Sequence, residues 1–165
     1  MNACWRVTRG EQDPATVGRL LGSLPDWFGI PAANAEYVEA ARELPTYLAR
    51  PERNAATGRA DPVGVLLARR HFAEAAEIHV LAVEPSLHRH GVGRALVAAL
   101  ESDLLADGCR MLQVKTLGPS KPHAGYERTR KFYAAAGFWP LEEVDLWGPD
   151  NPCLILVKIL AHTSM

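Results

Sequence analysis

The sequence predicts a mixed α/β fold with about seven mostly antiparallel strands, one parallel pair and about four helices. Three observations support this prediction. Several short segments alternate between apolar and polar residues, which is typical of half-buried strands. Apolar residues in segment 91–107 instead recur at i, i+4 spacing, which indicates an amphipathic helix. That helix separates two strand-like segments, 75–83 and 109–118, and such a crossover joins parallel strands.

The first third of the chain is expected to begin with a strand and a helix. Asp13 is a suitable N-cap for that helix, because its side-chain oxygen can accept a hydrogen bond from a free N–H group. Pro14 fits the first helical position, where no N–H group is needed. In order, the expected elements are strand 4–9, helix 13–24, a turn-rich loop 25–31, helix 32–44 and strand 46–50.

The rest of the chain is expected to hold a hairpin, two helices and three further strands. Segment 51–62 is polar and turn-forming, and we expect it to be the most mobile loop. Gly108 is placed to end the amphipathic helix. The apolar stripe of that helix consists of Val92, Leu96, Leu100 and Leu104. The remaining expected elements are hairpin strands 63–72 and 75–83, helix 91–107, strand 109–118, helix 126–137 and strands 138–147 and 152–160.

Composition indicates one soluble globular domain over residues 1–165. Apolar residues make up 48% of the chain and charged residues 22%, and the formal net charge is -1. Because there is no basic run, we expect no nucleic-acid partner. No apolar run approaches the roughly 20 residues that span a bilayer, and the N-terminus lacks a signal-peptide pattern. We therefore expect no membrane partner and a cytoplasmic location.

Glycines and cations gather between strand 75–83 and helix 91–107, in segment His88–Arg94. A helix N-terminus leaves unpaired N–H groups and a partial positive charge, so it attracts anions. Gly91 and Gly93 have no Cβ atom, which lets a phosphate approach the backbone closely. The segment therefore predicts a phosphate or pyrophosphate site, and a simple tight turn is the alternative. It is neither a dinucleotide fingerprint nor a P-loop, because the third glycine of the former and the GK[ST] of the latter are absent.

Two longer stretches resemble motifs of the GNAT superfamily of N-acetyltransferases. EIHVLAVEPSLHRHGVGRALV resembles the core motif, in which a strand leads through a Pro-containing turn into an Arg/Gln-x-x-Gly-x-Gly/Ala loop. RKFYAAAGF resembles the second motif, and the strong match covers roughly residues 75–140, which would form the acetyl-CoA core. The resemblance implies a GNAT-like acyl-CoA N-acyltransferase fold with a central splayed parallel pair. It also implies acetyl-CoA as co-substrate and no metal.

The resemblance also assigns cofactor-binding residues by position. It implies that backbone amides of the loop hold the pyrophosphate of acetyl-CoA, and that the preceding strand pairs with the pantetheine arm. Two positions depart from the family pattern, since His88 stands where Arg or Gln is usual and Tyr126 stands where many relatives carry Asn. The implied cofactor-binding residues are Leu81, Ala82, Val83, His88, Arg89, His90, Gly91, Val92, Gly93, Arg94 and Tyr126.

Acetyl transfer to an amine requires a base for the ammonium and an acid for the leaving thiolate. Tyr133 is the candidate acid, because it stands where the family often places that acid and a phenol is protonated at neutral pH. The alternative is a helix tyrosine that only packs on the sheet. Glu77 is the candidate base by resemblance to the histone acetyltransferase branch, and its apolar strand neighbours predict a raised pKa. A structural ion pair is the alternative for Glu77, and His79 is an alternative base.

The acceptor is expected to be a primary amine on a small molecule or a peptide. Aromatic residues could stack on it, although those in loop 25–31 could equally cap the core. Alternation places His79 on the same strand face as Glu77. The apolar last strand could supply a homodimer interface. The candidate substrate-binding residues are Trp27, Phe28, His79 and Trp147.

Taken together, these features predict an acetyl-CoA-dependent N-acetyltransferase that works by direct attack in a ternary complex, because no cysteine lies in a motif. The first alternative is a non-catalytic acyl-CoA-binding sensor or regulatory domain. The second is a metal-binding protein built on histidines, although their spacing matches no ligand motif. Those histidines are His71, His79, His88, His90 and His123.

Overall fold

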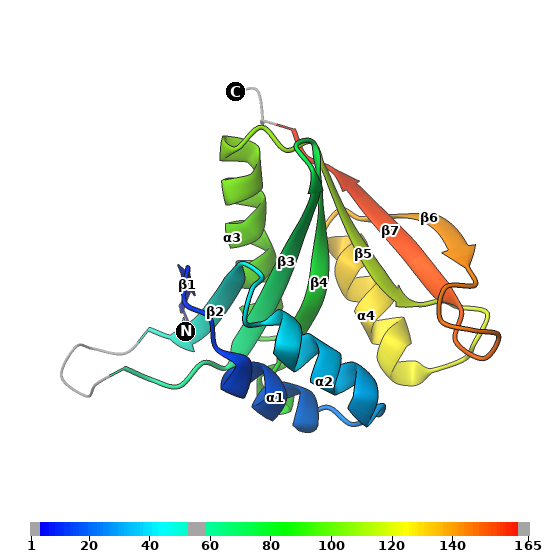
Figure 1. The fold of residues 1–165 in the computed structure, drawn as a ribbon, viewed down its shortest axis with the longest axis horizontal. Helices are drawn as coiled ribbons and strands as arrows, with labels where there is room; N and C mark the ends of the chain where they lie inside the picture. Colours follow the sequence, from blue (N-terminus) through cyan, green and yellow to red (C-terminus); the bar gives the residue numbers. More distant parts are fainter. Residues whose placement is uncertain (1–3, 53–58, 162–165) are drawn as a thin grey trace. The chain divides into compact units, whose positions relative to one another are not determined.

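A computed structural model describes residues 4–52 and 59–161 of the chain (Figure 1). In chain order the elements are β1 Trp5–Arg9, α1 Pro14–Gly22, α2 Pro31–Ala40, β2 Thr46–Pro51, β3 Gly64–Phe72, β4 Ala75–Val83, the 3-10 helix η2 Pro85–Leu87, α3 Val92–Ala106, β5 Met111–Leu117, α4 Ala124–Ala135, β6 Trp139–Val144 and β7 Cys153–Ile159. The predicted mixed α/β class is confirmed, and each expected helix and strand is present within a few residues of its predicted bounds.

The strands are hydrogen-bonded in the order β1-β2-β3-β4-β5-β7-β6. The parallel pair is β4 with β5, and its register runs from Ala75 opposite Met111 to Ile78 opposite Val114. The pairs β1–β2, β2–β3, β5–β7 and β6–β7 are antiparallel. The parallel pair is therefore the one that the 91–107 crossover helix predicted.

Contacts along the chain fall into two compact units. The first unit contains residues 1–69 and 80–102, and the second contains residues 70–79 and 103–165. Strands β3 and β4 thus supply residues to both units. A single domain over the whole chain stays a prediction.

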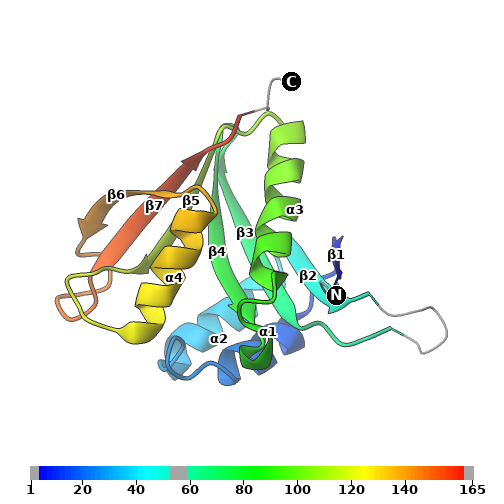
Figure 2. The ribbon, with the colours of Figure 1, turned by 180° about the vertical axis from the view of Figure 1, so that it is seen from behind.

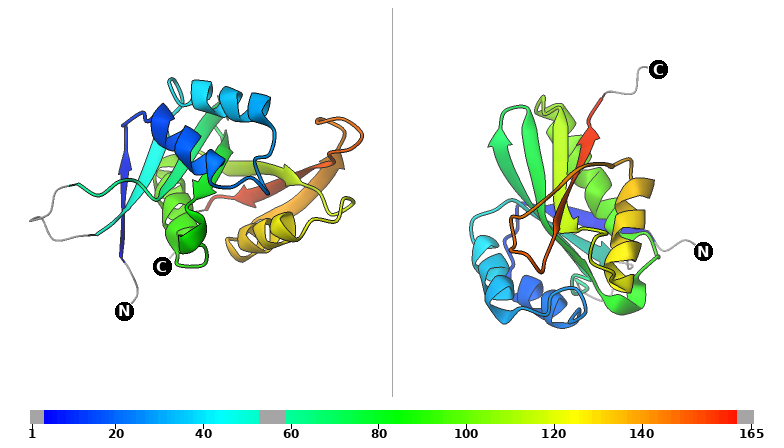
Figure 3. Two further views of the ribbon diagram at one scale, coloured as in Figure 1. Left: turned by 90° about the horizontal axis from the view of Figure 1, so that it is seen from below. Right: turned by 90° about the vertical axis from the view of Figure 1, so that its right-hand side faces the viewer.

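In the first unit, α1 and α2 lie on one face of the strands and α3 lies on the other (Figure 3). The core on the α1 side consists of Val17, Leu20, Leu21, Leu24, Ala41, Leu48, Val65, Leu67, Val80 and Ala82. Asp13 caps α1 as predicted, because its Oδ1 accepts a hydrogen bond from the Thr16 N–H at 2.9 Å. The expected apolar stripe of α3 is also buried: Val92, Leu96 and Leu100 belong to this unit, and Leu104 belongs to the second.

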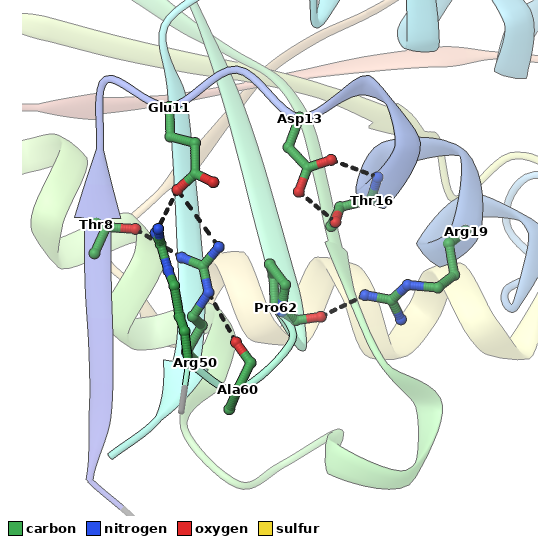
Figure 4. A network of polar contacts seen from close by, with 9 residues as sticks. Thr8, Glu11, Asp13, Thr16, Arg19, Arg50, Ala60 and Pro62 are labelled. Atoms are coloured by element: carbon green, nitrogen blue, oxygen red, sulfur yellow. Dashed lines mark hydrogen bonds and ion pairs between the residues drawn. The ribbon is translucent and has the colours of Figure 1, made fainter. Parts of the chain in front are cut away.

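A buried arginine joins separate parts of the first unit (Figure 4). Arg50 of β2 donates hydrogen bonds to the Thr8 Oγ1 and to the Ala60 carbonyl, both at 3.0 Å. Its guanidinium also lies 3.4 Å from a carboxylate oxygen of Glu11. Arg50 therefore fixes the chain at residue 60, near the end of the 51–62 loop. Segment 51–62 was expected to be the most mobile loop, but residues 53–58 within it lie outside the described residues.

The second unit is built on β5, β6 and β7, with α4 against β5 (Figure 2). Helix α4 begins two residues before its predicted start. The reason is His123, whose Nδ1 accepts a hydrogen bond from the Tyr126 N–H at 3.2 Å and so caps the helix. Histidine is not among the residues that usually cap helices, so the sequence did not predict this start.

Gly64 at the start of β3 allows α3 to pack closely on the sheet. A Cβ atom at this position would lie 2.7 Å from Val92 Cγ1 and 3.0 Å from Leu96 Cδ1. We expect Gly64→Ala to lower the free energy of unfolding by about 1–3 kcal/mol, because a well-packed core does not admit an extra methyl group without strain. Urea unfolding followed by circular dichroism measures the change.

Gly22→Ala is the matched control for this prediction. Gly22 ends α1, and a Cβ atom there would meet nothing within 4 Å. Alanine is the better helix former, so this variant should be as stable as the unaltered chain or slightly more stable. Equal losses in both variants would show that the contact between Gly64 and α3 is not the cause.

Candidate functional site

The junction between β4 and α3 has an irregular backbone that brings a helix N-terminus to the surface of the first unit. After Val83 the chain forms η2, and α3 begins at Val92. Gly91 has φ 86°, a left-handed conformation that glycine adopts without strain. Arg89 has φ 67° and is the one such non-glycine residue among residues 4–52 and 59–161. Strained backbone of this kind is typical of functional loops.

Three hydrogen bonds hold this junction in place. His88 Nε2 donates to the Val83 carbonyl at 2.8 Å, and His90 Nδ1 donates to the His88 carbonyl at 2.9 Å. Trp5 Nε1 of β1 then donates to the His90 carbonyl at 2.8 Å. The residue that departs from the family pattern, His88, thus ties the loop to the end of the strand. Its ring also meets the Trp27 ring edge-on, with centroids 5.6 Å apart.

The start of α3 has the groups that bind an anion. The first hydrogen bond at this end runs from the Ala95 N–H to the Gly91 carbonyl at 3.0 Å. The N–H groups of residues 92–94 therefore have no partner within the helix. Arg89 and Arg94 are exposed beside them, and Gly91 carries no Cβ. These features fit a phosphate or pyrophosphate group, as the sequence predicted.

The strand end that was expected to pair with the pantetheine arm also lies in the first unit. Along β4, Leu81 and Val83 are half-buried and Ala82 is buried, which is the alternation of a strand. One lone pair of the Val83 carbonyl is already used by His88. The Val83 carbonyl has a second lone pair that can accept another hydrogen bond. Pairing of residues 81–83 with the pantetheine arm stays a prediction.

In the second unit, Glu77 forms the centre of a charged cluster. Its Oε1 accepts a hydrogen bond from Lys115 Nζ at 2.8 Å, and its Oε2 lies 2.5 Å from His71 Nε2. Gln113 Nε2 adds a longer hydrogen bond of 3.4 Å to Oε2. The Glu77 side chain is only 8% exposed. The ion pair that was the alternative interpretation of Glu77 is thus present.

The predicted rise in the pKa of Glu77 is wrong. Burial does favour the neutral acid and raises the pKa, as the apolar neighbours suggested. The hydrogen bonds and positive charges of Lys115 and His71 outweigh burial, so the net pKa lies below the usual glutamate value. This net shift could not be predicted from the sequence, because the partners reach Glu77 from two other strands, β3 and β5.

Glu77→Gln should lower the free energy of unfolding by about 2 kcal/mol at about pH 7, because charged hydrogen bonds are lost. A folded-state pKa below the unfolded value of about 4.3 means that the carboxylate stabilises the fold above that pH. This stabilisation is lost as the pH falls through the folded pKa. The difference between variant and unaltered chain should therefore shrink at about pH 3, as urea unfolding at both pH values would measure.

Glu127→Gln serves as the control, since Glu127 also pairs with a lysine. Its Oε1 lies 3.0 Å from Lys131 Nζ, but both side chains are more than half exposed. Solvent screens such a pair, so this variant should change little at either pH. A Glu77→Gln effect that is constant with pH would contradict the role assigned to the buried carboxylate.

Tyr133 on α4 is buried between two aromatic rings of the second unit. It is 4% exposed, and the Phe132 and Phe138 ring centroids lie 5.0 and 5.3 Å from its own. Burial raises the pKa of its hydroxyl well above the usual value, so the group stays protonated and can donate. Tyr126 lies seven residues earlier on the same helix, and its ring centroid is 5.0 Å from that of the cap residue His123.

The candidate acceptor-binding residues fall into both units. In the first unit, Trp27 and Phe28 pack against the core, as the alternative interpretation predicted, and Phe28 meets Tyr37 edge-on. In the second unit, His79 is half-buried on β4. Trp147 lies beyond the end of β6 and is 41% exposed. Their contact with an acceptor stays a prediction.

The sequence did not reveal three residues that hold candidate site residues in place, one of them in the first unit and two in the second. Trp5 holds the loop from 85 positions away, and His71 and Lys115 hold Glu77.

In the described ranges, we find no group of three or more His, Cys, Asp or Glu side chains arranged to hold a metal ion. Nor does any helix there have the length and apolar character needed to cross a membrane.

Comparison with known proteins identifies one family. The sequence model of the Acetyltransferase (GNAT) family matches residues 22–138. Among curated proteins, no sequence match was found.

Solved structures with the same fold include three acetyltransferase-type proteins. A GNAT-family protein from Desulfovibrio desulfuricans has a TM-score of 0.78 and 22% identity, covering 96% of this chain and 100% of its own. The ribosomal-protein-S18-alanine N-acetyltransferase from Escherichia coli has a TM-score of 0.67 and 14% identity, and the match covers 96% of this chain and 97% of its own. A GNAT family acetyltransferase from Elizabethkingia anophelis with acetyl-CoA bound has a TM-score of 0.66 and 14% identity, and the match covers 94% of this chain and 98% of its own. At these identities the likeness shows the fold alone.

Proposed function

Because the chain belongs to the Acetyltransferase (GNAT) family, we propose that it transfers an acetyl group from acetyl-CoA to a primary amine. The observation that carries the proposal is the junction of β4 and α3. There, a glycine in the left-handed conformation, two exposed arginines and the first N–H groups of α3 come together in one unit. That set suits the pyrophosphate of a CoA thioester.

The first unit would hold the co-substrate. The N–H groups of residues 92–94 donate to the pyrophosphate, and Arg89 and Arg94 balance its charge. The His88 and His90 hydrogen bonds hold these groups in place before binding, which lowers the entropy that binding costs. Backbone groups of residues 81–83 pair with the pantetheine arm. Tyr126 is a further contact in the second unit.

The second unit would supply the acid and the base. Acetyl-CoA brings an activated thioester, whose carbonyl carbon an amine can attack once it has lost a proton. The Glu77 cluster removes that proton from the acceptor ammonium. Tyr133, kept protonated by burial, donates to the leaving thiolate. From the first unit, a backbone N–H near Leu81 would stabilise the negative charge that develops on the carbonyl oxygen.

Direct transfer without an acetylated cysteine fits the state of the three thiols. Cys109 and Cys153 are buried, and burial raises the pKa of Cys153. Cys4 is exposed, but its hydrogen bond with Glu52 and the negative charge of that residue raise its pKa. Thiols with raised pKa values are poor nucleophiles, because the thiolate is the reactive form.

The proposed acceptor is a primary amine on a small molecule or a peptide. Trp27, Phe28, His79 and Trp147 remain the proposed contacts. The named acceptor of the Escherichia coli neighbour is a ribosomal protein, so a peptide amine is compatible with this fold. Glu77 does not by itself favour a cationic acceptor, because its negative charge is already paired with Lys115 and His71.

Thiol release from acetyl-CoA tests the proposal. The purified chain is mixed with acetyl-CoA and, in turn, with kanamycin, spermidine, tyramine, Nα-acetyl-lysine and a tripeptide with a free N-terminus. We expect amine-dependent thiol release with at least one of them, and an acetylated amine by mass spectrometry. CoA binding by calorimetry without release for any amine would instead support an acyl-CoA-binding regulatory domain.

A further inference from the structure

His71, at the end of β3, is the exposed member of the Glu77 cluster. We propose that His71 is the general base that takes the proton from the acceptor amine, and that Glu77 is the positioning residue that orients its ring. The inference rests on the proposed acetyl transfer and assigns the proton to one atom, His71 Nδ1. It replaces direct action of the Glu77 carboxylate.

The Glu77 carboxylate is badly placed to receive a proton itself. Lys115 occupies Oε1 at 2.8 Å, while His71 and Gln113 both face Oε2. A proton on either oxygen would displace a hydrogen bond and leave the Lys115 charge without its partner. Only 8% of the side chain is exposed, so an acceptor has little access to it. The lowered pKa of this carboxyl agrees with that geometry.

His71 has the properties that Glu77 lacks. An ionised carboxylate can only accept, so His71 Nε2 must carry the hydrogen in their 2.5 Å contact. In the neutral ring, Nδ1 then holds the free lone pair. The side chain is 35% exposed, about four times as much as that of Glu77. Once Nδ1 takes a proton, the imidazolium charge lies directly beside the carboxylate, which stabilises it.

The proton movements balance over one turnover. The acceptor ammonium gives one proton to His71 Nδ1, either directly or through one water, so an N–H bond breaks and the Nδ1–H bond forms. The neutral amine then forms the C–N bond as the C–S bond breaks. The nitrogen gives up a second proton, which replaces the one that Tyr133 donates to the thiolate. His71 finally releases its proton to solvent.

The pH profile of kcat/KM for the His71→Gln variant tests this assignment, with the fastest amine found in the thiol-release panel. Glu77 of β4 faces the imidazole, Lys115 of β5 contacts the other oxygen of the same carboxylate, and His79 follows on the same face of β4. At about pH 7 we expect a loss of about 100-fold. The loss should shrink as the pH approaches the pKa of the amine, because a neutral amine needs no base.

Two further variants make the result decisive. Arg70→Gln changes a cation at the neighbouring position of the same strand, and it should keep the unaltered profile. Glu77→Gln should lose activity at about pH 7 as His71→Gln does, because the ring is no longer oriented. If His71→Gln keeps the unaltered kcat/KM while Glu77→Gln loses it, the base is Glu77 and the assignment to His71 is wrong. If the unaltered chain releases no thiol with any amine, the proposed acetyl transfer is wrong, and so is the role of His71 as its general base.

A spectroscopic measurement checks the geometry independently of activity. Nitrogen-15 NMR distinguishes the two neutral tautomers of a histidine ring. We expect the neutral His71 ring to carry its hydrogen on Nε2, and Glu77→Gln to shift this preference. A neutral ring protonated on Nδ1 in the unaltered chain would leave no lone pair there and would overturn the proposal.

Discussion

Gly91→Val should weaken the binding of CoA at least about 100-fold, because it would remove two or more charge-assisted hydrogen bonds of about 1.5–3 kcal/mol each. Gly91 has φ 86°, and a β-branched residue does not adopt that conformation without strain. The chain would have to change its path just before Val92, so the first N–H groups of α3 would no longer point to one anion. Calorimetric titration of the variant with CoA measures the loss.

Gly108→Val provides the matched comparison. Gly108 follows the other end of α3, has φ 77° and would place a Cβ atom in open space. The two variants therefore carry similar backbone strain, and thermal unfolding should show similar losses of stability. CoA affinity should fall only in Gly91→Val. Equal affinity in the two variants would contradict an anion site at the start of α3.

Tyr133→Phe should slow acetyl transfer by about 100-fold in a single turnover, since it removes a general acid. The ring contacts with Phe132 and Phe138 do not involve the hydroxyl, so CoA affinity and thermal stability should stay close to those of the unaltered chain. Rapid-quench measurement of acetylated amine gives the rate.

Tyr47→Phe is the control for the acid role. Tyr47 is another buried tyrosine, on β2 of the first unit, where its ring lies under the Arg9 guanidinium. Removing its hydroxyl should leave the transfer rate unchanged. An unchanged rate in Tyr133→Phe would mean that the thiolate leaves without this proton, and that Tyr133 only packs on the sheet.

Local sequence patterns were enough to predict the fold and the tight turn before α3. The stripe Val92, Leu96, Leu100 and Leu104 predicted α3, and those residues are buried. The glycines before that stripe predicted an anion-binding turn, because a helix start and its preceding loop are close in sequence. Gly91 indeed has a positive φ and comes directly before the helix.

The surroundings of Glu77 in the second unit, and the tie between Trp5 and the loop in the first, depend on contacts between distant residues. Alternation along β4 placed Glu77 on a strand, but it could not show which charges face it. Lys115 reaches it from 38 positions away and His71 from the preceding strand, and together they reverse the expected pKa shift. Trp5 reaches the loop from 85 positions away. The Glu77 pairs follow from strand register and the Trp5 contact from the packing of β1 beside the loop, and a single sequence specifies neither.

Amide NMR during a CoA titration is the most direct test of the central claim, that the start of α3 binds the pyrophosphate. A nitrogen-15-labelled chain is titrated with CoA while its amide signals are followed. The largest shifts should fall on Gly91, Val92, Gly93 and Arg94, because their N–H groups are at or next to the anion. Binding of CoA that leaves these four amides unshifted, or no binding at all, would contradict the claim.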